Sequence, residues 1–251
     1  MNMFFNKNDI IYQSIISPSL KVKCLQYNMN TINQSQPRTC FLSPHSDDTF
    51  IEAYYIIKEC VLPGPYLLCT VFSESNYVDI AKKKLYVGTD ISKIRKDEDL
   101  LFANEFNMQY ITLNEPDCLL RYGTVYFDEH PLANILLDKL YNQLSTCIEK
   151  HKIEYIIAPF PFGNKRHYDH RVLCEVAKRL EQNDGITLWW TDDSPYSQTP
   201  SDMIKRIIWR KTLTQEEIQF KSSQMDETYP SQTCDYYKEA IKKYDERLFV
   251  L

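Results

Sequence analysis

Five apolar runs of strand length recur along the chain, and they constrain the fold more than any other feature of the sequence. They occupy residues 39–43, 66–72, 110–113, 155–160 and 186–190. Each run is almost continuously apolar and does not alternate with polar residues, which is typical of strands covered on both faces. The pattern therefore predicts a buried sheet with helices on both sides.

Helical patterns lie between these runs. The clearest follows Pro131, a residue type favoured in the first turn of a helix, and continues as an apolar stripe to residue 148. Others cover residues 50–60, 94–106 and 172–180. Because strands that alternate with helices form right-handed βαβ crossovers, we expect an α/β, Rossmann-like three-layer sandwich with a mainly parallel sheet.

The length of 251 residues suits a single domain over residues 1–251. Residues 1–38 are rich in Asn, Gln and Ser and predict an irregular lead-in, with a short strand near residues 21–26. For residues 200–251 we expect a C-terminal helical segment. Its first helix begins at the capping box Thr214/Glu217, and a second covers residues 234–247.

Composition narrows the class of partner. The net charge is −5 and no block of like charges occurs, so we expect a small-molecule partner and no nucleic acid. The N-terminus is too polar for a signal peptide and no later stretch approaches membrane-span length, which predicts a cytoplasmic protein without membrane insertion. The eight cysteines are scattered singly, and we expect them to be small hydrophobic residues without chemistry.

Two polar clusters follow two of the expected strands. They are "PHSDD" after residues 39–43 and "HYDH" after residues 155–160. In an open parallel sheet, ligands bind at the carboxyl ends of the strands, where the strand order reverses. If these two strands are neighbours at that point, the clusters face each other across one crevice. Two histidines and one aspartate with an open fourth position are a catalytic-zinc arrangement.

These residues carry a resemblance to a known family. "SPHSDD" is similar to the AHPDD signature of the PIG-L/LmbE family of zinc-dependent N-deacetylases, and "HYDH" to its HPDH motif. Arg95 and Glu98 resemble the R-x-x-E helix of that family, "LNEPDC" its strand ending in Asp, and "WWTDDSPY" its late Tyr-Glu-Asp-x-Pro-Tyr stretch. The resemblance covers about residues 39–196, and only the two metal motifs are specific.

The resemblance implies a Zn²⁺ site with three ligands, His45, Asp48 and His170. It also implies that Asp47 is the general base that takes a proton from zinc-bound water. Two adjacent side chains cannot both face one metal without strain, so this division between Asp47 and Asp48 is physically reasonable. Zinc lowers the pKa of a bound water to ~7, where a carboxylate can accept the proton.

Four further roles follow from the same resemblance. His167 stabilises the oxyanion or protonates the leaving amine, and Asp169 orients His167. Arg95 and Asp117 match positions that reach the substrate sugar. The expected enzyme is a metal-dependent amide hydrolase that removes an N-acetyl or similar small acyl group from an amino sugar or another sugar-containing small molecule. Homo-oligomerisation stays open.

The chain departs from the family pattern at four positions. Ser46 replaces a proline, Thr49 a glutamate and Tyr168 a second proline, while Lys165 stands where some relatives carry a tyrosine. None of these changes removes an expected metal ligand. They alter the rigidity of the loop and one carboxylate near the metal.

Three other functions were weighed. A metallo-β-lactamase-type site needs a histidine at the position of Lys165, so its ligand set is incomplete. A nicotinamide enzyme is disfavoured because the first strand is followed by "PHSDD" and not by a glycine-rich loop. A non-catalytic sugar-binding or scaffold protein on a decayed deacetylase fold stays open, because of the changes at Ser46, Thr49 and Tyr168.

Overall fold

The computed structural model describes residues 36–124, 131–163 and 166–251, which belong to one compact unit. Its sheet has seven strands in the order β3-β2-β1-β4-β5-β7-β6. The strands are β1 Thr39–Ser43, β2 Tyr66–Thr70, β3 Gln109–Thr112, β4 Tyr155–Phe160, β5 Thr187–Asp192, β6 Arg206–Lys211 and β7 Glu246–Val250. Neighbours among β1 to β5 pair in parallel, and β7 is antiparallel to β5 and β6.

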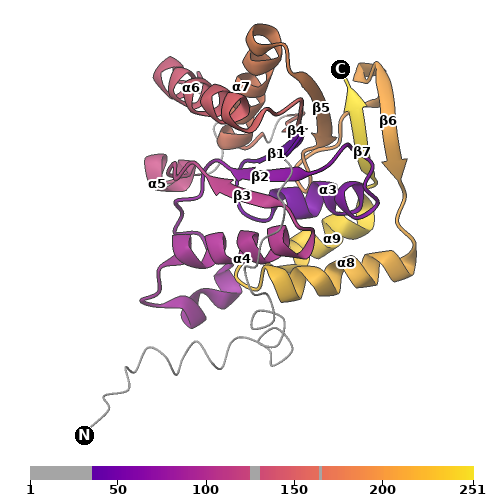
Figure 1. Cartoon of the computed structure of the whole chain (residues 1–251). Helices are drawn as coiled ribbons and strands as arrows, with labels where there is room; N and C mark the ends of the chain where they lie inside the picture. Colours follow the sequence, from indigo (N-terminus) through magenta and orange to yellow (C-terminus); the bar gives the residue numbers. More distant parts are fainter. Residues whose placement is uncertain (1–35, 125–130, 164–165) are drawn as a thin grey trace, which may run out of the picture. The chain divides into compact units, whose positions relative to one another are not determined.

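Helices cover both faces of the sheet, as Figure 1 shows. On one face lie α6 Asn134–His151 and α7 Tyr168–Asp184, and on the other lie α3 Asp48–Lys58, α4 Ile91–Glu105, α8 Gln215–Thr228 and α9 Asp235–Lys243. Shorter helices are η1 Ile80–Tyr86, α5 Cys118–Tyr122 and η2 Ser201–Met203. The expected α/β three-layer sandwich with a mainly parallel sheet is confirmed.

Neighbouring residues within a strand enter opposite halves of the core. Cys40 and Leu42 pack with α6 and α7, whereas Phe41 between them packs with α3 and α4. Ile156 and Ile157 of β4 divide in the same way. Successive side chains of a strand point to opposite faces, so a strand covered on both sides must be apolar throughout. This alternation explains the continuous apolar runs.

The strand order reverses between β1 and β4, which pair directly through Thr39↔Tyr155, Cys40↔Ile156 and Phe41↔Ile157. The predicted neighbourhood of these two strands is therefore confirmed. Because the strands are parallel, the segments that follow them leave the sheet at the same edge.

The C-terminal segment corrects one expectation. The capping box of Thr214 and Glu217 starts α8 as predicted. Residues 234–247 are not one helix, however, because α9 ends at Lys243 and Glu246 begins β7. Residues 200–251 are also not wholly helical, since β6 and β7 complete the sheet. Pairing of β7 between β5 and β6 outweighs the local helical pattern.

Residues 1–35 lie outside the described part of the chain. Three expectations therefore stay predictions for these residues: the irregular lead-in over residues 1–38, the short strand near residues 21–26 and their inclusion in a single domain over residues 1–251. Among the described residues, no helix has the length and apolar character needed to cross a membrane.

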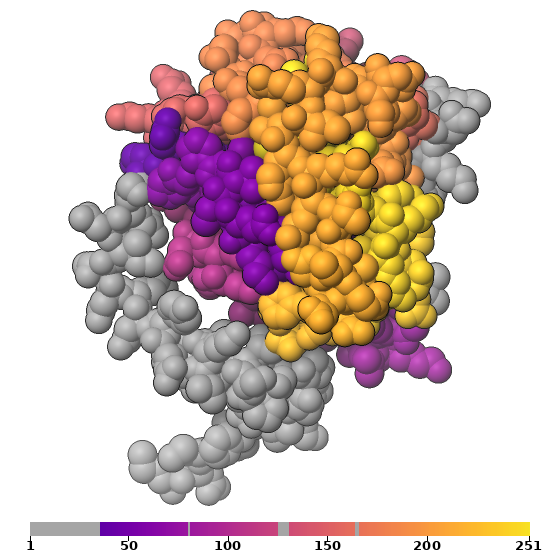
Figure 2. Space-filling view, turned by 90° about the vertical axis from the view of Figure 1, so that its right-hand side faces the viewer, coloured from indigo at the N-terminus to yellow at the C-terminus, as the bar shows by residue number. Residues whose placement is uncertain are grey.

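A buried ion pair fixes the C-terminal segment to α3. Lys221 of α8 donates to Glu246 Oε1 at 2.5 Å and to the carbonyl of Ile51 at 2.6 Å. Glu246 Oε2 accepts from the backbone N–H of Tyr55 at 2.8 Å. Figure 2 shows the orange and yellow C-terminal segment directly against the purple segment of the first half of the described chain.

We expect Lys221→Met to lower the free energy of unfolding by ~3–5 kcal/mol, because Glu246 would lose the cation that compensates its buried charge. The matched control is Lys242→Met, since Lys242 pairs with Glu239 on the surface of α9. That change should cost less than about 1 kcal/mol. Urea denaturation of both variants measures the difference, and equal midpoints would contradict the assigned role of the buried pair.

Candidate active site

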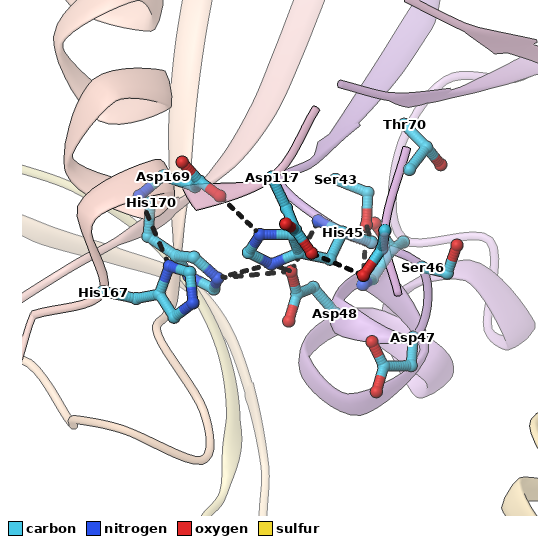
Figure 3. Close-up of polar contacts among 12 residues, drawn as sticks. Ser43, His45, Ser46, Asp47, Asp48, Thr70, Asp117, His167, Asp169 and His170 are labelled. Carbon is cyan, nitrogen blue, oxygen red and sulfur yellow. Dashed lines mark hydrogen bonds and ion pairs between the residues drawn. The ribbon is translucent and has the colours of Figure 1, made fainter. Parts of the chain in front are cut away.

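The loop of residues 44–47, called here the motif loop, connects β1 to α3 and carries His45. Asp48 is the first residue of α3, and His170 lies in the first turn of α7. His45 Nδ1 lies 3.2 Å from Asp48 Oδ2, which lies 3.3 Å from His170 Nε2. The two histidine nitrogens are 3.2 Å apart. These three atoms form the acceptor triangle, in which the residues point toward one another (Figure 3).

The three atoms are called acceptors because a carboxylate lies on the far side of each imidazole. Asp169 Oδ2 lies 2.9 Å from His45 Nε2, and Asp193 Oδ1 lies 2.5 Å from His170 Nδ1. A carboxylate accepts hydrogen bonds, so a histidine that holds a cation here would keep its N–H on the outer nitrogen and turn a lone pair toward Asp48. Three buried acceptors around one point repel one another unless a cation lies between them.

The dimensions of the acceptor triangle fit a metal ion. Nitrogen and oxygen ligands at 2.0–2.1 Å around tetrahedral zinc are about 3.3–3.4 Å apart. The observed separations are 3.2–3.3 Å. A carboxylate behind each ligating imidazole is also what metal sites commonly have. His45, Asp48 and His170, the expected ligands, are therefore brought together in a geometry that could hold a divalent metal.

Other groups of candidate ligands share the same region. They are His45/His167/His170, Cys118/His167/Asp169 and Asp48/Glu52/His170. The second is less suitable, because the carboxylate of Asp169 already accepts from several donors. In the third, Glu52 accepts from Thr191 at 3.2 Å and lies behind the site on α3. In the first, His167 has no carboxylate bonded behind its ring but accepts a backbone N–H there, whereas Asp169 and Asp193 stand behind the two imidazoles of the acceptor triangle, which we take as the best ligand set.

Asp47 turns away from the triangle. Its backbone is left-handed, with φ 86°, so its side chain diverges from that of Asp48 (Figure 3). Its Oδ1 lies 3.6 Å from Arg95 Nη2, and its buried Oδ2 has no hydrogen-bond partner among the described residues. Burial, followed by the charge of Asp48, raises the pKa of Asp47. The carboxylate borders the pocket and is available to a ligand.

His167 lies at the start of α7, with its ring beside those of His45 and His170. Its Nδ1 accepts from the backbone N–H of Asp169 at 3.3 Å. Burial, followed by the charges of His45 and His170, lowers the pKa of His167, so the ring is neutral. A neutral imidazole that accepts at Nδ1 carries its proton at Nε2.

The position of Asp169 revises its expected role. Its carboxylate accepts from His45 Nε2, from the backbone N–H of Cys118 at 2.8 Å and from the guanidinium of Arg121. It therefore orients His45 through its side chain, and it reaches His167 through its backbone N–H. The order of residues in "HYDH" could not distinguish these two partners.

Arg95 and Asp117 both line the pocket, together with His45 and Asp48 of the triangle. Arg95 donates to Ser75 Oγ at 3.0 Å, and Ser75 in turn donates to Asp117 Oδ2. Asp117 also caps α5 by accepting from the backbone N–H of Leu120. The two residues are thus connected through Ser75. Their contact with a substrate stays a prediction.

The pocket has a volume of about 250 Å³. Its lining includes His45, Asp47, Asp48 and His167, and four tyrosines that we call the tyrosine wall: Tyr77, Tyr196, Tyr236 and Tyr237. Tyr196 packs against the rings of His167 and His170. Gln232 and Cys234 lie beside it.

Several site residues were missed in the sequence. Asp193 lies in "WWTDDSPY", a stretch that was compared with the family but not given a role. Its position after a buried strand was the available signal. Tyr196 ends the same stretch. Arg121 and the other three tyrosines of the wall had no such signal, because their contact with the site depends on how distant segments fold together.

A family model described as GlcNAc-PI de-N-acetylase (PIG-L) matches residues 40–181, more than half of the chain. The chain belongs to the PIG-L family. The match includes the polar clusters "PHSDD" and "HYDH" as well as Arg95 and Asp117, and it stops before Asp193 and Tyr196. A search of curated protein sequences finds no match.

Solved structures share the fold of this PIG-L protein at low sequence identity. A deacetylase in complex with teicoplanin superposes with a TM-score of 0.62 at 16% identity, covering 84% of this chain and 96% of the other. The A40926 pseudoaglycone deacetylase Dbv21 gives 0.58 at 16%, covering 86% and 97%. An N,N'-diacetylchitobiose deacetylase from Pyrococcus horikoshii gives 0.53 at 13%, covering 99% and 94%.

We expect Asp193→Ala to weaken divalent-metal binding by this PIG-L protein about 10–100-fold, because His170 would lose the carboxylate that fixes its ring and its tautomer. The control is Asp184→Asn at the far end of α7, where the aspartate contacts Tyr141 near the surface. Competition of each variant with a chromogenic chelator measures the affinity. Equal affinities for Asp193→Ala and wild type would show that Asp193 does not support the ligand.

Proposed function

We propose that this protein is a zinc-dependent hydrolase that removes an N-acetyl or similar small acyl group from an amino sugar. The observation that carries the proposal is the acceptor triangle next to Asp47, whose Oδ2 has no hydrogen-bond partner among the described residues and whose side chain lines the same pocket as His45 and Asp48. Membership of the PIG-L family supports the same reaction.

Two imidazoles and one carboxylate with an open fourth position are a ligand set of catalytic zinc sites. His45, Asp48 and His170 would hold the ion, with Asp169 and Asp193 fixing the two rings. Zinc bound there would polarise the amide carbonyl and lower the pKa of an attacking water. The proton transfers of the reaction would be carried out by side chains around the ion.

Asp47 is suited to be the general base. It lies next to the ligand Asp48 in sequence, but its left-handed backbone directs its carboxylate into the pocket and away from the triangle. Arg95, 3.6 Å away, holds one oxygen and leaves the other without a partner among the described residues. That oxygen takes the proton from water as the water attacks the amide carbon.

His167 is suited to be the general acid. The backbone N–H of Asp169 donates to Nδ1, so the ring carries its proton on Nε2, from which Cys118 Sγ lies 3.8 Å away. His167 gives this proton to the nitrogen that departs as the C–N bond breaks, which leaves a free amine and a carboxylate. Tyr196 packs against the ring of His167 and limits its movement.

The tyrosine wall supports a sugar substrate. Its rings offer flat apolar faces, and the hydroxyls of Tyr196 and Tyr237 have no hydrogen-bond partner among the described residues. Sugar rings present apolar faces together with hydroxyl groups, so such a surface can pack against one and bind the other. The Pyrococcus horikoshii neighbour is named as a deacetylase of N,N'-diacetylchitobiose, which consists of N-acetylated amino sugars.

We expect zinc-loaded wild-type protein to release free amine from one or more members of a panel of N-acylated amino sugars. Asp47→Asn should retain zinc and lower kcat by ~10²–10⁴-fold, because it removes the base but no ligand. His170→Ala should lose both zinc and turnover. Amine release and metal analysis on the same samples measure the two properties separately.

The outcomes also separate the hydrolase from a non-catalytic sugar-binding or scaffold protein. Stoichiometric zinc without turnover on any member of the panel would favour the binding protein, and near wild-type turnover by Asp47→Asn would exclude Asp47 as the base. A cytoplasmic location and homo-oligomerisation stay predictions.

Removing the hydroxyl of Tyr237 tests the tyrosine wall. Tyr237→Phe should raise KM for the amino sugar about 2–10-fold with a smaller change in kcat, because one hydrogen bond of ~0.5–1.5 kcal/mol is lost from substrate binding. Tyr141→Phe on α6 is the matched control and should leave both constants unchanged. Steady-state kinetics of both variants provide the comparison. An unchanged KM would remove Tyr237 from the substrate site.

A further inference from the structure

Two side chains of helix α4 form hydrogen bonds with Ser46 of the motif loop, one with its backbone and one with its hydroxyl. Arg95 Nη2 donates to the carbonyl oxygen of Ser46 at 3.1 Å, and Ser46 Oγ donates to Asp99 Oδ2 at 3.0 Å. Arg95 and Asp99 are four residues apart on α4, so they present their side chains from the same face of the helix. Ser46 itself lies between the ligand His45 and the proposed base Asp47.

Asp99 is a buried acceptor that connects four parts of the fold. Its Oδ2 accepts from the hydroxyls of Ser46, Thr70 at 2.6 Å and Tyr110 at 3.3 Å, and its Oδ1 accepts from Tyr229 at 3.0 Å. These donors come from the motif loop, β2, β3 and the end of α8. Asp99 is only 1% exposed, and a buried network in which each group is paired fixes its members in one arrangement.

The backbone of Asp47 needs such support. Its φ of 86° and ψ of −29° are close to those of the third residue of a type II turn, which glycine or asparagine normally occupies. Other residues adopt this conformation only where their surroundings hold them in it. A proline fixes its own φ and so restrains the chain next to it, and the residue directly before Asp47 is Ser46. The family signature AHPDD has a proline there, and this chain does not.

We propose that Asp99 is a positioning residue for the reaction: by holding Ser46 together with Arg95, it keeps Asp47 in the left-handed turn that directs its carboxylate into the pocket. The hydrogen bond from Ser46 thus replaces the restraint that a proline provides at this position. The inference deepens the proposed function and rests on the assignment of Asp47 as the base.

The metal ligands are held independently of Asp99. The backbone N–H of His45 donates to Asp48 Oδ2 at 2.8 Å, and the rings of His45 and His170 are fixed by Asp169 and Asp193. Loss of the Ser46 hydrogen bond should therefore release Asp47 while the acceptor triangle stays intact. This separation distinguishes positioning of the base from general support of the site.

Ser46→Ala and Thr70→Val form a matched pair, because each removes one hydroxyl from the same oxygen of Asp99. Figure 3 shows Ser46 and Thr70 on the side of the site away from His167 and His170. Both variants should lose similar thermal stability. Ser46→Ala should lower kcat about 10–100-fold with unchanged KM and zinc content, as expected for a misplaced base. Thr70→Val should keep kcat within about 2-fold of wild type, because the motif loop retains its hydrogen bond.

Ser46→Pro provides the rescue test. In wild type, Asp99→Asn should lower kcat at least about 10-fold. In the Ser46→Pro background the same change should cost less than about 3-fold, because the proline restrains the turn without Asp99. Equal losses in the two backgrounds, or equal losses of kcat in Ser46→Ala and Thr70→Val, would overturn the proposal.

Crystal structures of Ser46→Ala and Thr70→Val give a readout that does not depend on turnover. Asp47 should keep its positive φ in Thr70→Val and leave it, wholly or in a second conformer, in Ser46→Ala. If Asp47 keeps that conformation in Ser46→Ala, the proposal is wrong whatever the activity. If Asp47 moves as expected but wild type hydrolyses no member of the panel, positioning stands and the proposed function fails.

Discussion

The parallel pairing of β1 with β4 is the constraint on which the rest of the site depends. Three residue pairs place these strands side by side, although more than one hundred residues separate them in sequence. Since both strands run in the same direction, the motif loop and the start of α7 leave the sheet at one edge. Without this pairing, the segments that carry His45 and His170 would not lie next to each other. The 3.2 Å separation of their ring nitrogens is a consequence of the strand order.

A second level of organisation comes from α4. Asp99 binds the motif loop, whereas its neighbour Glu98 accepts from the backbone N–H and the hydroxyl of Ser231, close to the tyrosine wall. One helix is therefore hydrogen-bonded both to the motif loop and to Ser231, which precedes the pocket residue Gln232. Burial raises the pKa of Glu98 to about 7 and that of Asp99 to about 6. Buried carboxylates of this kind are unfavourable by themselves, and their bonded donors compensate for that cost.

The sequence predicted the helices and strands better than it predicted which side chains contact one another. The continuous apolar runs indicated the five parallel strands, because both faces of each strand are covered. The two histidine clusters indicated a metal site, because their positions relative to the strands are local information. The expected contact of Asp169 with His167 is made by its backbone N–H, whereas its carboxylate accepts from His45, a partner that "HYDH" alone does not indicate. The helix expected over residues 234–247 failed for a related reason: whether "ERLFV" forms a strand depends on the strands beside it.

By itself the sequence determined which strands are buried, which segments between the parallel strands are helical, and which side chains could bind a metal or move a proton. These properties follow from periodicity, capping residues and functional groups, and all of them are encoded within a few neighbouring residues. The tertiary structure alone decided that Asp193 supports His170, that Asp99 holds Ser46, and that tyrosines from the second half of the chain complete the pocket. Each of these contacts joins residues far apart in sequence. Their pairing is set by the order of strands in the sheet and by the packing of helices on it, and a local pattern does not contain that information.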